Sequence, residues 1–458
     1  MQNKLPAALL LTAISTSAFA LSTPPNVIFI LTDDLGYSDI EPYGQQIIRT
    51  PNLSKMAENG MQFMQFYCGT SVSAPSRASL MTGLHTGHTH VRGNQEYAPE
   101  GQEPVGNMKT LGNLFQQAGY VTGIYGKWGL GFPGSGSEPT KKGFDYFFGY
   151  NCQRQAHTFY PKWLWENDEK TILTGKEYSQ DLIHRQALSF IRSNANQPFF
   201  AYITYTLPHA GLEQPDDSIL KMYSGKFPET PYSGNGNYAP ADEPRAQFAG
   251  MVTRMDAYVG EIRNELKQLG IEENTLLIFT SDNGPHMEGG ADPAFFANEQ
   301  TLRGTKRSLY EGGIRVPTIM EWKGTISAGV KSELPSAFWD FMPTFVQLTQ
   351  QTKSWKQKTD GVSILPTITG KGKQKSHKYL YWEFHEEGGR QAVRQGDWKL
   401  IKQMIKSGNP TFELYNLKND PLEKTDLSAE NPDKVRKLKK QMDKAHTPSE
   451  MFTFGIDK

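Results

Sequence analysis

Four short apolar segments, three of them preceded by a helical pattern, most constrain how this chain can fold. The segments are residues 27–31, 121–125, 199–205 and 276–280. They are rich in β-branched and aromatic residues and lack polar alternation, as is typical of parallel strands covered on both faces. Helical patterns precede the last three, at residues 109–117, 182–193 and 245–269. Strands that alternate with helices predict an α/β fold, with a doubly wound, mixed or mostly parallel sheet flanked by helices.

Polar residues closely follow each predicted strand. Asp33 and Asp34 follow the first, Lys127 the second, His209 the third, and Asp282 and Asn283 the fourth. Because ligands of open parallel sheets bind at the carboxyl ends of the strands, we expect these side chains to converge on one site. The carboxylates and the amide offer the hard oxygen ligands that Ca²⁺ prefers. Either pair alone would be typical of a turn, but the two together predict a divalent metal site.

The first twenty residues have the pattern of a secretory signal peptide. Lys4 precedes an apolar stretch, and Ala18, Phe19 and Ala20 form a small-residue cleavage site. The stretch is too short to span a bilayer, and a buried N-terminal helix is the alternative interpretation. We therefore predict a signal peptide at residues 1–20 and an exported protein, in a bacterial periplasm or secreted, that is not a membrane protein.

The charge balance and the cysteine count exclude several classes of protein. The 458 residues carry 48 Lys and Arg against 48 Asp and Glu. A net charge of zero argues against nucleic acid or an anionic membrane surface as a partner. The two cysteines, Cys68 and Cys152, make neither a disulfide framework nor a metal knuckle. A single disulfide and two buried thiols both remain open.

After about residue 360 the pattern changes to short strands joined by turns. They cover residues 379–384, 391–394, 398–401 and 411–414, and a polar, basic helix follows at residues 432–445. We therefore predict a smaller unit with an antiparallel sheet and a helix at residues 361–458, beside a larger unit at residues 21–360. The Gly-, Pro- and Asn-rich residues 223–244 predict a long surface loop at the rim of the site.

A helix start rich in small residues lies between the two acidic pairs. Residues 71–83 read Ser-Val-Ser-Ala-Pro-Ser-Arg-Ala-Ser-Leu-Met-Thr-Gly. Pro75 favours the first turn of a helix, whose N-terminus attracts anions. Arg77 lies one turn beyond Ser73, so it can point to the same place and neutralise negative charge there. From the residues alone, an ordinary helix start is the simpler interpretation.

This segment resembles the signature of the type I sulfatases, in which a Cys or Ser at the position of Ser73 is oxidised to formylglycine. The resemblance rests on Ser73-Ala74-Pro75-Ser76-Arg77 with Leu80-Met81-Thr82-Gly83, Pro25-Asn26-Val27 with Asp33-Asp34, Gly126-Lys127-Trp128, Leu207-Pro208-His209, Ser281-Asp282-Asn283-Gly284, and Leu302-Arg303-Gly304-Thr305-Lys306 with Glu311-Gly312-Gly313. Six motifs in the family's order, spread over nearly the whole mature chain, make the match specific. The resemblance implies an alkaline-phosphatase-like fold and a sulfatase that hydrolyses sulfate esters.

Two cofactors follow from the resemblance. It implies that Ser73 becomes formylglycine (3-oxoalanine) and that one Ca²⁺ is held by Asp33, Asp34, Asp282, Asn283 and the modified Ser73. In such enzymes one hydroxyl of the hydrated aldehyde attacks sulfur and the other then expels sulfate, whereas a plain serine would be left as a stable sulfate ester. A serine at this position also implies a radical-type sulfatase-maturing enzyme that acts before export, which fits a bacterial source.

The same resemblance implies catalytic roles for four further residues. Lys127 and Lys306, together with Ca²⁺, would neutralise charge on the sulfuryl oxygens. His209 would bind sulfate or protonate the leaving oxygen. Arg77 would hold the hydroxyl of the nucleophile.

One position departs from the family pattern. Many relatives carry a His that contacts formylglycine directly after the Gly-Lys-Trp motif, where this chain has Gly129. The task of that His is either absent here or taken by another residue, such as His157.

Three polar segments, at residues 87–94, 153–157 and 382–389, supply the candidate substrate-binding residues. These residues are His88, His90, Arg92, Asn94, His157, His385 and Glu386. Such side chains are typical of sugar pockets, although each taken singly is equally typical of a loop. Together they resemble those of sulfatases that act on galactose or N-acetylgalactosamine sulfates, so we expect a sulfated saccharide as substrate.

Two alternative functions remain open at this point. One is a phosphoester or phosphonate hydrolase of the same superfamily that uses unmodified Ser73. Such enzymes more often have a two-metal site rich in His and Asp, and the sequence lacks an obvious second ligand set. The other is a catalytically inactive, glycan-binding relative, which Gly129 favours and the complete set of catalytic residues disfavours.

Overall fold

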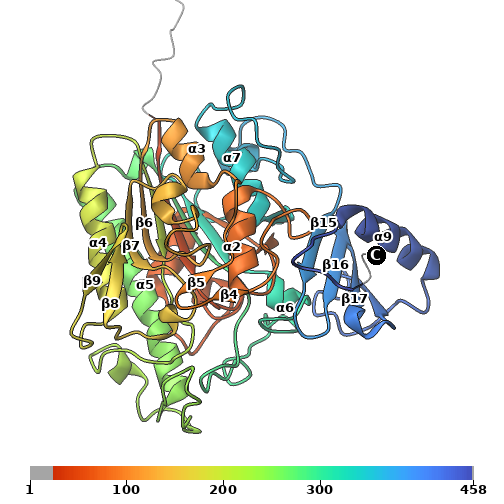
Figure 1. The fold of residues 1–458 in the computed structure, drawn as a ribbon, viewed down its shortest axis with the longest axis horizontal. Coiled ribbons are helices and arrows are strands. Elements are labelled where there is room, and N and C mark those ends of the chain that lie inside the picture. The colour runs from red at the N-terminus through yellow and green to blue at the C-terminus, as the bar shows by residue number, and fades with distance from the viewer. Residues whose placement is uncertain (1–23, 456–458) are drawn as a thin grey trace, which may run out of the picture.

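A ten-stranded mixed sheet forms the centre of the larger part of the molecule (Figure 1). The structure, a computed structural model, describes residues 24–455, and the predicted signal peptide lies outside this range. In spatial order the strands are β13 (Val330–Ser332), β2 (Met61–Phe63), β12 (Thr318–Glu321), β11 (Thr275–Ser281), β1 (Asn26–Thr32), β10 (Phe199–Thr204), β6 (Val121–Lys127), β7 (Tyr146–Tyr150), β8 (Trp163–Glu166) and β9 (Glu169–Ile172).

The middle of this sheet is parallel. Strands β11, β1, β10, β6 and β7 run in one direction, and the four strands predicted from apolar runs are the neighbours β11, β1, β10 and β6. The predicted α/β fold with a mostly parallel sheet is therefore confirmed. Leu31 of β1 pairs with both Thr204 of β10 and Thr280 of β11. Because this register ends the strands at the same level, the residues that follow them meet at one edge of the sheet.

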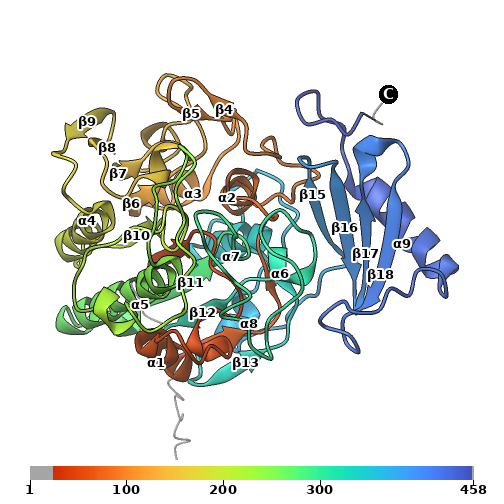
Figure 2. The same cartoon turned by 90° about the horizontal axis from the view of Figure 1, so that it is seen from below.

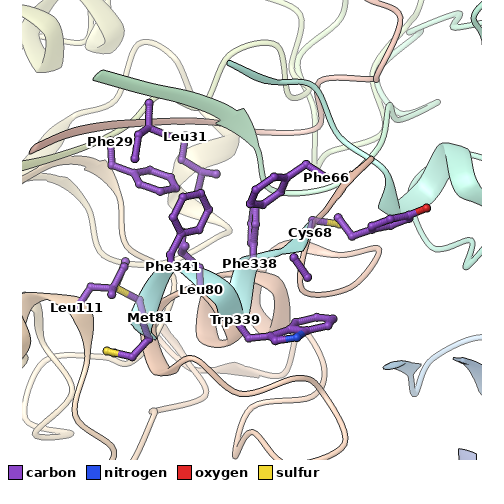
Figure 3. Packing of buried hydrophobic residues seen from close by; sticks show 14 of the residues in the cluster. Phe29, Leu31, Phe66, Cys68, Leu80, Met81, Leu111, Phe338, Trp339 and Phe341 are labelled. Carbon is purple, nitrogen blue, oxygen red and sulfur yellow. The ribbon is translucent and has the colours of Figure 1, made fainter. Parts of the chain in front are cut away.

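Helices cover both faces of the sheet. One face carries α1 (Pro51–Asn59), α4 (Ser179–Ser193) and α5 (Pro244–Gln268), and the other carries α2 (Ser73–Thr82), α3 (Leu111–Gln117) and α7 (Phe341–Leu348). Successive residues of β1 point to opposite faces, so Ile30 joins the first core whereas Phe29 and Leu31 join the second. Figure 3 shows Phe29 beside Phe341 of α7, with ring centroids 4.8 Å apart. This packing buries α2 over its whole length.

A four-stranded antiparallel sheet and one helix form the C-terminal unit, at one end of the molecule (Figure 2). The strands are β15 (Leu380–Phe384), β16 (Arg390–Gln395), β17 (Trp398–Gln403) and β18 (Thr411–Asn416), and the helix is α9 (Pro432–Ala445). Leu400 of the sheet and Leu438 of α9 share a buried cluster. On β15, Trp382 donates from Nε1 to the carbonyl oxygen of Cys68 at 3.0 Å, which joins the two units. The predicted sheet and helix are confirmed, and the boundary after residue 360 stays a prediction.

Short elements complete the fold around the large sheet. β3 (Phe66–Tyr67) pairs with β14 (Ser336–Ala337), and β4 (Glu96–Tyr97) pairs with β5 (Gly101–Gln102) in a hairpin. The helices α6 (Glu311–Ile314) and α8 (Leu365–Thr369) are each about one turn long.

Three further sequence expectations concern the loop, the cysteines and the membrane. The predicted loop at residues 223–244 precedes α5, and a single bridge pairs Tyr232 with Ala241. Cys68 and Cys152 are both buried and free, so the open question of a disulfide is answered in favour of two thiols. Within residues 24–455, no helix is long and apolar enough to cross a membrane.

Candidate active site

The polar residues at the strand ends form one buried cluster, as the sequence predicts. Asp33 and Asp34 follow β1, Lys127 ends β6, His209 lies beyond β10, Asp282 and Asn283 follow β11, and Ser73 begins α2. These side chains are all buried, and Lys306 joins them from a loop. The sheet register therefore brings together residues that are far apart in the sequence.

Ser73 lies between a carboxylate and an ammonium group. Its Oγ donates to Oδ1 of Asp33 at 3.0 Å. Nζ of Lys127 lies 2.5 Å from the other oxygen of Asp33 and 3.5 Å from Oγ of Ser73. Because Ser73 begins α2, the positive end of the helix dipole also lies at this point. The surroundings of Ser73 favour negative charge on a group bound there.

Arg77 neutralises two of the acidic residues from one turn farther along α2. Its Nε donates to Oδ2 of Asp282 at 3.0 Å, and Nη2 lies 3.6 Å from Oδ2 of Asp33. Burial, and then the charge of Asp33, raises the pKa of Asp282 to about 7. Burial acts in the same direction on Asp33, but the positive charges of Lys127 and Arg77 outweigh it and hold the pKa of Asp33 well below its usual range. The site therefore balances a dense group of carboxylates with cations.

The acidic residues fit a divalent cation. Asp34 and Asp282 are linked by a hydrogen bond from the Asp34 amide to Oδ1 of Asp282 at 3.1 Å. Asn283 donates from Nδ2 to Oδ1 of Asp34 at 2.6 Å, while its Oδ1 is buried and has no partner among the described residues. An unpaired buried carbonyl oxygen beside carboxylates is a hard ligand set of the kind that Ca²⁺ uses. Asp33, Asp34 and His209 also lie within metal-binding distance of one another.

His209 and Lys306 form the second cationic side of the site. Nζ of Lys306 donates to Asp34 Oδ2 at 2.8 Å and to Glu288 Oε2 at 2.9 Å, and lies 3.2 Å from Nε2 of His209. Nδ1 of His209 contacts the carbonyl oxygen of Ala210, so Nδ1 carries the proton and Nε2 accepts from Lys306. Burial and the neighbouring Lys306 hold the pKa of His209 well below its usual value, so the imidazole is neutral.

Two aromatic side chains lie beside the ring of His209. The ring of His157 stacks on it at 4.9 Å between centroids, and the ring of Tyr238 lies 6.0 Å away. Tyr238 belongs to the long loop that was predicted at the rim of the site. His157 is thus adjacent to His209.

The space beside Gly129 is occupied by Gln153. A Cβ at Gly129 would lie 3.2 Å from Nε2 of Gln153 and 3.9 Å from Cδ of Arg77. Nε2 of Gln153 is buried and has no hydrogen-bond partner among the described residues. The side chain next to Gly129 is therefore an amide, and the hypothesis that His157 takes the role of the missing His stays a prediction.

The other predicted substrate-binding residues fall into two groups. Oδ1 of Asn94 accepts a hydrogen bond from the backbone amide of Ala74 at 2.9 Å, and Oε1 of Glu386 accepts one from the backbone amide of Asn94 at 3.0 Å. Asn94 therefore lies beside the start of α2, and Glu386 lies next to Asn94. The remaining four bind elsewhere: His88 contacts Asp360, His90 lies near Glu103, and Arg92 and His385 both contact Glu383. His88 lies beyond the C-terminal end of α2, a helix about 15 Å long, so it is remote from Ser73.

Sequence reasoning missed three residues of the site. Glu288 pairs with Lys306 and also lies 2.5 Å from Nη2 of Arg307, yet no motif marks it. Tyr238 was foreseen only as part of a rim loop. Gln153 lies in one of the polar segments, at residues 153–157, but no motif marks it.

The fold and this site together define the class of the protein. The sulfatase family model matches residues 25–351, and the model for the C-terminal region of N-sulphoglucosamine sulphohydrolase matches residues 304–448. The chain therefore belongs to the sulfatase family, as the sequence motifs predict, and is a sulfuric ester hydrolase of the type I, alkaline-phosphatase-like group.

Individual relatives and structures agree with this membership. The chain is 32% identical over 394 residues to the N-acetylgalactosamine-6-sulfatase of Canis lupus familiaris, covering 79% of this chain and 69% of that protein. It is 27% identical over 507 residues to the N-acetylgalactosamine-6-O-sulfatase of Bacteroides thetaiotaomicron, covering 93% and 94%. The crystal structure of Ps i-CgsB in complex with k-i-k-neocarrahexaose has a TM-score of 0.78, with 28% identity and 92% of each chain covered.

Proposed function

We propose that this protein hydrolyses sulfate esters of a sulfated carbohydrate of the galactose or N-acetylgalactosamine type, with formylglycine made from Ser73 and one Ca²⁺. The observation that carries the proposal is the position of Ser73, whose Oγ lies 3.0 Å from Asp33 and 3.5 Å from Lys127 at the start of a buried helix. This position puts a nucleophile beside an ammonium group and the positive end of a helix dipole, which suits the transfer of an anionic sulfuryl group.

Formylglycine would supply the nucleophile toward sulfur and a route for sulfate release that plain serine lacks. The residues around position 73 serve that group in separate ways. Asp33 accepts from its hydroxyl, which orients it, and Lys127 keeps a positive charge beside it. Arg77 holds Asp33 and Asp282 in place. Oxidation to the aldehyde would remove the Oγ hydrogen that Ser73 donates to Asp33, and hydration of the aldehyde would restore a hydroxyl that can donate there.

Asp33, Asp34, Asp282 and Asn283 would hold Ca²⁺, together with residue 73. The unpaired Oδ1 of Asn283 and the three carboxylates support this set. A divalent cation there would supply positive charge beside the sulfuryl oxygens. It would also offset the repulsion between Asp33 and Asp282, which contributes to the raised pKa of Asp282.

Lys306 and His209 are suited to the leaving side of the reaction. In this structure His209 accepts from Lys306 and is neutral. A bound sulfate ester would bring negative charge next to both residues, which favours the imidazolium form and raises the pKa of His209. The protonated His209 could then donate to the leaving oxygen of the sugar.

The proposed sugar specificity rests on the relatives and on the side chains near His209. One relative named above is an N-acetylgalactosamine-6-sulfatase and another an N-acetylgalactosamine-6-O-sulfatase, and the related structure of Ps i-CgsB holds k-i-k-neocarrahexaose. Imidazole and phenol groups at His157 and Tyr238 are typical of a sugar pocket. We further propose export to the periplasm or beyond after a radical maturase has acted on Ser73.

The test is peptide mass spectrometry combined with sulfate release. The full chain is produced with and without an anaerobic sulfatase maturase, and a panel of sulfated galactose and N-acetylgalactosamine saccharides is assayed. We expect the peptide with Ser73 to lose two hydrogens only when the maturase is present, and sulfate release to follow that loss. Ser73→Ala should abolish release, whereas Ser71→Ala, a buried serine two residues earlier, should not.

An unmodified Ser73 in the presence of a competent maturase would overturn the formylglycine proposal. Activity on phosphate esters in that state would support the alternative, a phosphoester or phosphonate hydrolase. Binding of sulfated saccharides without turnover would support the inactive, glycan-binding alternative.

A further inference from the structure

A hollow of about 290 Å³ lies next to the side chains that contact His209. It is lined by Glu96, Arg154, His157, Thr158, Asn237 and Tyr238, among others. Its volume is near the lower end of the range for small-molecule sites, which is roughly 300–1,000 Å³. The hollow is therefore large enough for one sugar unit.

Two side chains form a shared wall between this hollow and the catalytic cluster. His157 stacks on His209 at 4.9 Å, and its ring also lies 4.9 Å from that of Tyr238. His209 in turn lies 3.4 Å from Asp34 across the cluster. A ligand in the hollow would therefore contact two side chains that also contact His209.

The lining combines hydrogen-bonding groups with one aromatic face. His157, Thr158 and Asn237 offer donors and acceptors, and Tyr238 offers a ring. A sugar combines hydroxyl groups with an apolar ring face, so this lining suits a sugar better than a purely apolar or a purely charged ligand.

An exposed ion pair marks the outer end of the hollow. Arg154 donates to Glu96 from Nε at 2.9 Å and from Nη2 at 2.5 Å, which leaves Nη1 for a ligand. The two side chains are 69% and 33% exposed, so a ligand can reach both. A carboxylate beside a guanidinium can bind vicinal sugar hydroxyls as acceptor and donor.

The same ion pair borders a second hollow of about 390 Å³, on the β4–β5 hairpin. This second hollow is lined by Tyr97, Pro99 and Cys152 as well as by Glu96 and Arg154. Glu100 anchors its wall through a hydrogen bond from Trp165 at 2.6 Å and an ion pair with Lys170 at 3.0 Å. The two hollows therefore form a path that leads away from His209 past Arg154.

We propose that the substrate is an oligosaccharide whose neighbouring sugar unit binds at Glu96 and Arg154, while the sulfated unit lies at the catalytic cluster. This inference rests on the proposed function and adds the size of the substrate to it. Arg154 and Glu96 are specificity residues for the saccharide chain beyond the sulfated unit, and they do not take part in the chemical step.

The test compares a sulfated monosaccharide with a disaccharide and a tetrasaccharide that carry the same sulfate, using the full chain with a mature residue 73. For the wild type we expect kcat/KM to be higher for the oligosaccharides. Arg154→Ala should lower kcat/KM about tenfold for them, mainly through KM, because one hydrogen bond to a charged group is lost. The value for the monosaccharide should change less than about twofold. Glu96→Gln should act in the same direction.

Arg49→Ala is the matched control. Arg49 forms a comparable Arg–Glu pair with Glu41 at 2.6 Å, with the Arg 60% exposed, but it does not line either hollow. The kcat/KM of this variant should equal that of the wild type for every substrate.

Equal loss on all substrates in Arg154→Ala, or no loss on any, would overturn the inference while the wild type stays an active sulfatase. A wild type with modified residue 73 that releases no sulfate from any substrate would instead overturn the proposed function, and this inference with it.

Discussion

Arg77 and Asp282 form a fully buried ion pair in which two nitrogens of the guanidinium meet one carboxylate oxygen. Nε donates at 3.0 Å and Nη2 lies 2.8 Å from Oδ2, and the side chains are 1% and 0% exposed. The pair joins the second turn of α2 to the end of β11, so it connects the helix that carries the nucleophile position to the proposed metal ligands. Such a pair stabilises the fold only while both charges are present, because each pays a desolvation cost.

Arg77→Ala should therefore damage both stability and turnover. It leaves Asp282 and Asp33 with Lys127 as the nearest cation, and removing one partner of a buried pair costs about 3–5 kcal/mol. We expect a lower thermal midpoint and a loss of kcat on the order of 10²-fold. Arg77→Lys keeps the charge but not the paired contacts, and should fall between wild type and Arg77→Ala. Wild-type kcat in Arg77→Ala would contradict this role.

The central strands could be predicted because strands that are buried on both faces consist of apolar residues. Residues 27–31 and 276–280 are uninterrupted apolar runs, and the structure covers both faces of β1 and β11. The short strands β8, β9, β12 and β13, toward the two ends of the sheet, could not be predicted in this way. These strands are three or four residues long, which is too short for a recognisable sequence pattern. Pairing with neighbouring strands, rather than their own sequence, places these residues in the sheet.

Site residues could be predicted where the end of a strand determines their position. They could not be predicted where a contact between distant segments determines it. Asp33 and Asp282 follow from the parallel register alone. Arg92 and His385 have the side chains of a sugar pocket, but both contact Glu383, a buried carboxylate between the two units. Composition cannot distinguish a side chain that binds a ligand from one that binds a partner inside the protein. Glu288 was missed for the converse reason, since only the folded chain brings it to Lys306.

Calcium should stabilise the folded protein. A ligand that binds only the folded state adds about 2.7 kcal/mol at a concentration one hundred times its Kd, so the thermal midpoint should rise by several degrees. The measurement is thermal unfolding of protein treated with EGTA, with and without added CaCl₂. Asn283→Ala removes the unpaired carbonyl oxygen and should reduce the shift. An equal midpoint with CaCl₂ and with EGTA would contradict a calcium site here.

A second buried ion group should hold the C-terminal unit to the larger one. Nζ of Lys399 on β17 lies 2.9 Å from Glu311 and 3.0 Å from Glu423, and all three side chains are 0% exposed. Burial raises the pKa of Glu311, but Lys399 and two nearby arginines outweigh it and lower that pKa to about 2, so Glu311 stays charged.

Lys399→Met should leave Glu311 without its nearest cation and destabilise the protein by about 3–5 kcal/mol. Thermal or urea unfolding measures the loss. Lys418→Met, an exposed lysine just beyond the same sheet, is the control and should unfold like the wild type. If Lys399→Met has the same unfolding midpoint as the control, the ion group does not stabilise the junction between the two units.

His377 and Asp340 should make stability depend on pH. Nε2 of His377 lies 2.7 Å from Oδ1 of Asp340, which is fully buried. Burial disfavours the imidazolium, but the adjacent carboxylate outweighs it and raises the pKa of His377 above 6.5. The contribution is therefore complete below pH 6.5 and is lost as the pH rises through the raised pKa. The midpoint difference between wild type and His377→Gln should shrink with rising pH, and a constant difference would refute this.

Gly129 should tolerate a side chain less well than another glycine with the same backbone angle. Gly129 and Gly136 both have φ of +72°, but a Cβ at Gly129 meets Gln153 at 3.2 Å, whereas Gly136 has nothing within 4 Å. Gly136→Ala reports backbone strain alone, about 1 kcal/mol, and Gly129→Ala should cost more. Adding Gln153→Ala should make Gly129→Ala cost less, measured against Gln153→Ala alone by thermal unfolding. Equal costs for the two glycines would show that Gln153 does not occupy the space of the missing His.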